Sequence, residues 1–91
     1  MAITVKFFAN FREAAGVEKT VIEEATDVYS LLKALVAKFG DRLGRQLFDG
    51  EKLRETVSII VNGRSVDPAQ DLRHKLRDGD VVAIFPPVSG G

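Results

Sequence analysis

The chain has 91 residues, 45% hydrophobic and 29% charged, which is typical of one soluble globular domain and leaves no room for two cores. Its 13 basic and 13 acidic side chains balance, so no bulk field favours nucleic acid or an anionic membrane as a partner. The absence of cysteine excludes disulfides, thiolate metal sites and a cysteine nucleophile.

Residues 3–8 alternate between apolar and polar side chains and predict a β-strand. The apolar positions of one face are Ile3, Val5 and Phe7. Phe8 therefore falls on the opposite, non-core face. Residues 10–15 predict a short helical turn that ends at Gly16.

Alternation resumes over residues 17–23, which predict a second strand. We expect Val17, Val21 and the stem of Lys19 on one side of it. Because a helical turn separates the two strands, we expect an antiparallel pair joined by a loop longer than a tight hairpin.

The clearest helix begins after Thr26 or Asp27, because either side chain can accept hydrogen bonds from the first free amides. Gly40 is positioned to end it. Apolar residues at three- and four-residue spacing form one stripe, which predicts the main core contact against a sheet. They are Val28, Leu31, Leu32, Leu35 and Phe39. Residues 41–52 have weaker helical spacing and predict a second helical segment that covers one end of the core.

Residues 56–61 predict a strand, and Asn62-Gly63 is the strongest tight-turn signal in the chain, before a short return strand at 64–66. Asp67-Pro68 is expected to break that strand, and residues 71–76 to form a helical turn or irregular structure. After the turn Asp78-Gly79-Asp80, the nearly all-apolar residues 81–85 are typical of a strand that has neighbours on both edges.

The predicted order is strand, strand, helix and three further strands. A right-handed crossover through the long helix places the last strand parallel to the first. This arrangement is a β-grasp of the α+β class, in which a mixed five-stranded sheet packs on one main helix. We assign residues 1–85 to this domain and residues 86–91 to an extended, flexible tail.

The chain carries no signal-peptide pattern and no apolar run near the roughly 18 residues of a membrane span, so we expect a cytoplasmic protein. Its single histidine, His74, stands among charged neighbours. One histidine cannot form a metal site alone, and we expect a solvated surface side chain and no bound metal.

The tail is the most informative segment: Pro86, Pro87, Val88, Ser89, Gly90 and Gly91. The two prolines favour extended backbone and donate no hydrogen bond, whereas the two glycines fit where any side chain would collide. Six extended residues span roughly 20 Å, enough to deliver the Gly91 carboxylate into another protein's buried site. The alternative is a linker stub or a cloning remnant.

Residues 7–16, the turn at 78–80 and the end 85–91 together resemble the ubiquitin-like sulfur carriers of the MoaD/ThiS type. The likeness is strongest to archaeal MoaD, the small subunit of molybdopterin synthase, and to the small archaeal modifier proteins. The segment 41–55 is longer than in the compact bacterial form, as in the archaeal variety.

The resemblance implies that an activating enzyme uses ATP and magnesium to adenylate Gly91, and that sulfur then converts it to a thiocarboxylate for molybdopterin synthesis. It implies no catalytic side chain and no bound cofactor in the chain itself. The implied partners are the activating enzyme and the large subunit of molybdopterin synthase. These would meet an apolar surface that includes Phe8, Phe85 and a third position, which falls at Val66 or Ser65 depending on the alignment.

Three alternatives stay open. The same activated Gly91 can form an isopeptide bond with target lysines, as in a protein modifier, and both roles can coexist. A thiamine-type sulfur carrier shares the diglycine end, although such chains are usually shorter and lack the double proline. In the third, the chain is a non-covalent β-grasp interaction domain in which the diglycine is incidental.

Overall fold

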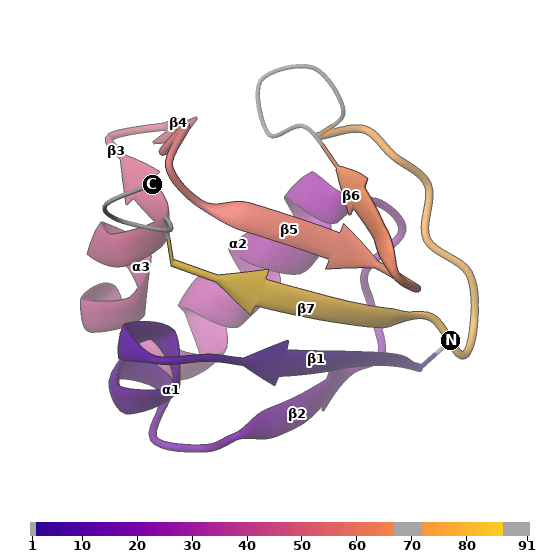
Figure 1. Cartoon of the computed structure of the whole chain (residues 1–91), viewed down its shortest axis with the longest axis horizontal. Helices are drawn as coiled ribbons and strands as arrows, with labels where there is room; N and C mark the ends of the chain where they lie inside the picture. The colour runs from indigo at the N-terminus through magenta and orange to yellow at the C-terminus, as the bar shows by residue number, and fades with distance from the viewer. Residues whose placement is uncertain (1, 67–71, 87–91) are drawn as a thin grey trace.

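Figure 1 shows the computed structural model, which describes residues 2–66 and 72–86. The elements in chain order are β1 (Ile3–Phe7), α1 (Asn10–Ala15), β2 (Lys19–Ile22), α2 (Val28–Phe39), α3 (Asp41–Leu47), β3 (Phe48–Asp49), β4 (Lys52–Leu53), β5 (Ser58–Val61), β6 (Arg64–Val66) and β7 (Val81–Phe85).

Five strands form one mixed sheet in the order β2-β1-β7-β5-β6, and α2 passes behind it (Figure 1). The first and last strands, β1 and β7, pair in parallel, whereas β1–β2, β5–β7 and β5–β6 pair antiparallel. The central position of β7 matches its nearly continuous apolar sequence, since it has a neighbour on each edge. The predicted β-grasp is confirmed.

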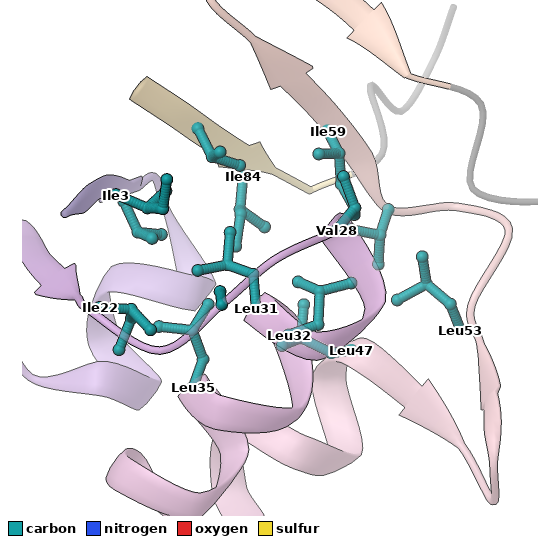
Figure 2. Packing of buried hydrophobic residues seen from close by; sticks show 14 of the residues in the cluster. Ile3, Ile22, Val28, Leu31, Leu32, Leu35, Leu47, Leu53, Ile59 and Ile84 are labelled. Carbon is teal, nitrogen blue, oxygen red and sulfur yellow. The ribbon is translucent and has the colours of Figure 1, made fainter. Parts of the chain in front are cut away.

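The core lies between the sheet and α2 (Figure 2). Leu31, Leu32 and Leu35 of the helix are fully buried against residues such as Ile59 and Ile84 of the sheet. Each such side chain stabilises the fold by roughly 1.5–3 kcal/mol relative to an exposed position. The apolar stripe that the spacing predicts is therefore the main core contact.

A capping box begins α2 after Asp27. The Asp27 carboxylate accepts a hydrogen bond from the Ser30 amide at 2.7 Å, and the Asp27 amide donates to the Ser30 hydroxyl at 3.1 Å. Burial opposes ionisation of Asp27, yet the Ser30 hydrogen bonds and the charges of Arg73 and Lys75 together lower its pKa. Of the two predicted caps, Thr26 and Asp27, the structure has Asp27, and the helix ends at Phe39, directly before Gly40 as predicted.

The helical segment predicted over residues 41–52 is confirmed in part: α3 ends at Leu47 and packs beside α2. Gly44 permits this close approach, because a Cβ there would lie 3.0 Å from Val36 Cγ1. The small hairpin β3–β4 that follows was not predicted from the sequence. It turns at Gly50 and pairs Phe48 with Leu53, whose side chains both close the end of the core.

The second strand is shorter than predicted, since it spans Lys19–Ile22 and not residues 17–23. Its inward residue is Ile22, whereas Val17 and Val21 are 40% and 48% exposed. The cause is the register, which sets Ile22 opposite Ile3 and so places both on the core face. Val21 then points to the other face of the sheet.

The turns agree better with the sequence. Asn62 and Gly63 have φ angles of 51° and 84°, the left-handed pair that a tight hairpin turn requires, and they join β5 to β6. Residues 72–76 are irregular, with Leu76 buried and His74 exposed as expected. The expected break at Asp67-Pro68 and residue 71 lie outside the described residues.

Candidate functional site

The central strand β7 delivers the chain to the tail. It ends at Phe85, and Pro86, the first residue of the tail, is half-buried and is the last residue described. Because β7 pairs with β1 on one side and β5 on the other, two ladders fix the position and direction of its end. The tail residues Pro87, Val88, Ser89, Gly90 and Gly91 lie outside the described residues.

Two aromatic rings meet at this root of the tail. Phe8 and Phe85 stack face to face, with ring centroids 4.3 Å apart and planes inclined by 12°. They meet because β1 and β7 run parallel, so the C-terminal ends of both strands lie at the same edge of the sheet. Each side chain is half-buried, and neither belongs to the core. We call this the ring pair.

The placement of Phe8 agrees with the sequence prediction. Its neighbour Phe7 points inward and is only 2% exposed, so Phe8 lies on the face that α2 does not cover. Phe8 stacks on Phe85, whereas Phe11 is buried in the core. Offset or stacked rings contribute about 0.5–1.5 kcal/mol beyond their buried area, so the two rings hold each other in place on the surface.

The prediction that Val66 contributes to this surface is wrong. Val66 is 4% exposed and sits opposite Ile59, with both side chains directed into the core. Because side chains alternate along a strand, the outward position of β6 belongs to Ser65, opposite Ile60. The third position of the surface is therefore polar, as the alternative alignment allowed.

The outer face of the sheet also carries residues that the sequence analysis did not single out. Ala83 and Ile60 are half-buried neighbours on β7 and β5. They extend the apolar surface of the ring pair along the outer face of the sheet. The signal for them is the same alternation that places Phe85 outward, since residues 81, 83 and 85 share a face.

The rim of the ring pair is charged. A hollow of about 370 Å³ beside Phe8 is lined by Lys6, Arg12 and Lys19 among others. Arg12 donates to the Glu18 carboxylate at 3.0 Å, so its charge is largely balanced. Lys6 and Lys19 lie directly opposite each other across the β1–β2 pair. This side of the ring pair therefore offers uncompensated positive charge to an approaching surface.

The opposite end of β7 is held by polar contacts. The Asp80 carboxylate accepts hydrogen bonds from the Arg77 amide at 2.8 Å and from Asn62 Nδ2 at 2.9 Å. These two bonds, the amide first, lower the pKa of Asp80. Asn62 also accepts from the Val81 amide at 2.9 Å. The network fixes where β7 begins, and thus the register that brings Phe85 to Phe8.

Within residues 2–66 and 72–86, no group of three or more histidine, cysteine, aspartate or glutamate side chains could hold a metal ion. None of the helices in that part of the chain is long and apolar enough to span a membrane. The described site presents a half-buried aromatic pair with a positively charged rim, placed where β7 ends.

Comparison with known proteins matches the sequence model of the ThiS family to residues 5–91. Small archaeal modifier protein 3 of Haloferax volcanii is 36% identical over 94 residues, which cover 100% of both chains. The molybdopterin synthase sulfur carrier subunit of Escherichia coli is 35% identical over 89 residues, covering 98% of this chain and 99% of that one.

Solved structures agree. The crystal structure of SAMP1 from Haloferax volcanii matches with a TM-score of 0.83 and 31% identity, covering 100% of both chains. A chain of the Amycolatopsis orientalis BexX/CysO complex matches with a TM-score of 0.75 and 28% identity, covering 99% of this chain and 100% of that one.

Proposed function

The chain belongs to the ThiS family, and from this membership and the ring pair at the root of its tail we propose that it is a ubiquitin-like sulfur carrier. An activating enzyme adenylates the Gly91 carboxylate with ATP and magnesium. A sulfur donor then displaces AMP and leaves a thiocarboxylate, whose sulfur is donated for molybdopterin synthesis. The proposed compartment is the cytoplasm.

The chemistry explains why a second protein must act. A carboxylate is a poor acyl group, because its negative charge repels nucleophiles and oxide is a bad leaving group. In the activation step the Gly91 oxygen attacks the α-phosphorus of ATP, and pyrophosphate leaves. In the second step a sulfide equivalent (HS⁻) attacks the acyl carbon, AMP leaves with the oxygen, and the sulfur loses its proton to give the thiocarboxylate. Gly90 and Gly91 carry no side chain that could obstruct either attack.

The observation that carries the proposal is the position of the ring pair. A partner that holds Phe8 and Phe85 holds the start of the tail, because Phe85 is the last residue of β7. Binding of a partner to this surface of the sheet therefore also positions the reactive Gly91 carboxylate. The proposed occupants of this surface are the activating enzyme and, afterwards, the large subunit of molybdopterin synthase. The chain itself works as a carrier and supplies no catalytic side chain.

A second function is supported by the relative named small archaeal modifier protein 3. In this role a lysine amine of a target protein attacks the same activated Gly91, and an isopeptide bond forms. The activation step is shared, so one chain can serve both roles.

Intact mass spectrometry of the protein purified from its own host tests both. The spectrum first establishes that the mature chain ends at Gly91. A gain of about 16 Da marks replacement of one oxygen by sulfur, which we expect for the carrier. Larger adducts that contain a Gly91–lysine branch mark conjugation. A terminus beyond Gly91 in every mature molecule, or neither modification in cells that make molybdopterin, contradicts the proposal.

A further inference from the structure

The outer edge of β2 is an unusual part of this sheet. β2 stands at one end of the strand order, along the lower edge in Figure 1, and no strand of the described ranges pairs with its outer side. Unpaired edges are templates for another strand. The large apolar side chains found exposed on the described surface, Val17 and Val21, both belong to this strand or its approach.

The hydrogen-bond pattern of β1–β2 identifies the free backbone groups. The Phe7 amide donates to the Glu18 carbonyl at 2.8 Å. Bonded pairs alternate along an antiparallel ladder, so in the β1–β2 register Thr20 and Ile22 also direct their backbone groups toward β1. The amides and carbonyls of the intervening residues, Lys19 and Val21, therefore point away from the sheet.

The same residues carry a self-complementary sequence. Lys19-Thr20-Val21-Ile22-Glu23 has an apolar β-branched residue at its centre, a positive charge two positions before it and a negative charge two positions after it. When two copies run antiparallel about a two-fold axis at Val21, the two Val21 residues face each other. Lys19 of each copy then faces Glu23 of the other, on both sides of the axis.

From this pattern we propose that the outer edge of β2 is a self-association surface, on which a second copy of the chain pairs antiparallel with Val21 opposite Val21 and Lys19 opposite Glu23. The occupant is a second copy because the charges complement each other only in this antiparallel, two-fold arrangement. The pairing joins two five-stranded sheets into one continuous sheet. Opposite charges at facing positions stabilise such pairs, and like charges destabilise them.

The local charges favour this register further. Within one copy Lys19 faces Lys6, a like-charged pair, so the carboxylate of Glu23 from the second copy also relieves that repulsion. Glu18 comes opposite Glu24 in this register, but Glu18 is already neutralised by Arg12. Moving the axis by one residue to Thr20 would set Lys19 opposite Val21 and lose both facing charge pairs.

The association leaves the ring pair itself open and shares with its surroundings Glu18 and Lys19, which line the hollow beside Phe8. The ring pair lies at the β1–β7 end of the molecule, on the outer face of the sheet, and not along the β2 edge. Because the two copies run antiparallel, their tails leave at opposite ends of the joined sheet. Each tail can then meet its own partner, so this inference does not rest on the proposed function.

Charge-swap variants of the full chain test the register. Sedimentation velocity from about 10 µM to about 1 mM covers the range in which a weak edge contact is populated, and we expect a concentration-dependent dimer. Lys19→Glu and Glu23→Lys each create two facing like-charged pairs, and each is expected to weaken the dimer at least tenfold. An equimolar mixture of the two variants restores both opposite-charge pairs, so we expect a heterodimer.

Matched controls separate this effect from net charge and from misfolding. Arg42→Glu and Glu51→Lys make the same charge changes at exposed positions away from β2, and we expect them to dimerise like the wild type. Circular dichroism establishes that each variant is folded. Amide exchange at Lys19 and Val21 is expected to slow with concentration.

Three results would overturn the proposal. They are a wild-type chain that stays monomeric at about 1 mM, a mixture of the two charge variants that forms no heterodimer, and a dimer in which Val21→Lys has no effect.

Discussion

Replacing Phe8 by alanine probes the ring pair most directly. The change removes the stacked contact with Phe85, worth about 0.5–1.5 kcal/mol. Because Phe8 is half-buried, the loss of apolar area adds about 1 kcal/mol. We therefore expect the free energy of unfolding to fall by about 1.5–2.5 kcal/mol. The matched control is Phe11→Ala, the same chemical change at a ring that is only 1% exposed, where about 3–5 kcal/mol is expected.

Phe8→Ala should weaken docking to the partner strongly, although it lowers the free energy of unfolding only mildly. The variant removes one ring and leaves the other without its support, so we expect affinity for the cognate activating enzyme to fall by more than about 1 kcal/mol, or at least about fivefold. Isothermal titration calorimetry measures the affinity, and thermal unfolding followed by circular dichroism measures the stability. Leu72→Ala, which removes a half-buried apolar side chain near the start of α2 and away from the ring pair, should bind normally. Wild-type affinity for Phe8→Ala, or a stability loss as large as that of Phe11→Ala, would show that Phe8 is not an exposed docking contact.

Three further predictions concern the tail and the start of β7. Deleting Gly91 should abolish AMP formation by the activating enzyme, measured as nucleotide release, and unchanged turnover would reject the carrier proposal. Gly90→Val should block sulfur transfer while leaving the melting temperature within a few degrees of the wild type, since surface substitutions change stability by about 0.5 kcal/mol or less; a core-sized loss would contradict this. The pKa of Asp80 is lowered below 3.8 by folding, so the unfolded chain binds more protons, and the stabilisation present above pH 3.8 is lost as the pH falls through the folded value. Asp80→Asn should reduce the fall in the free energy of unfolding at acid pH, measured by urea titrations at successive pH values. An unchanged fall would show that Asp80 does not contribute to it.

The fold was predictable because its main elements have strong local signals. The stripe of α2, the Asn62-Gly63 turn and the continuous apolar run of β7 each indicate one structure. The parallel pairing of β1 with β7 then follows from connection handedness. That pairing also accounts for the meeting of Phe8 and Phe85, which are far apart in the sequence.

The errors arose where a strand's orientation depends on its partner. Residues 21 and 22 are both apolar, so only the register with β1 decides that Ile22 faces inward. The same reasoning separates Val66 from Ser65, because the β5–β6 register turns the valine into the core. The hairpin β3–β4 has strands of two residues each, too short for any periodic pattern to reveal.

The position of β7 between two ladders has a mechanical consequence. Tension applied to the chain through its last residues reaches β7 first, and it acts along the strand, so the bonds to β1 and β5 are loaded in shear together. We therefore expect a domain that is tethered through this end to resist forced unfolding by motor proteins that pull on the attachment point.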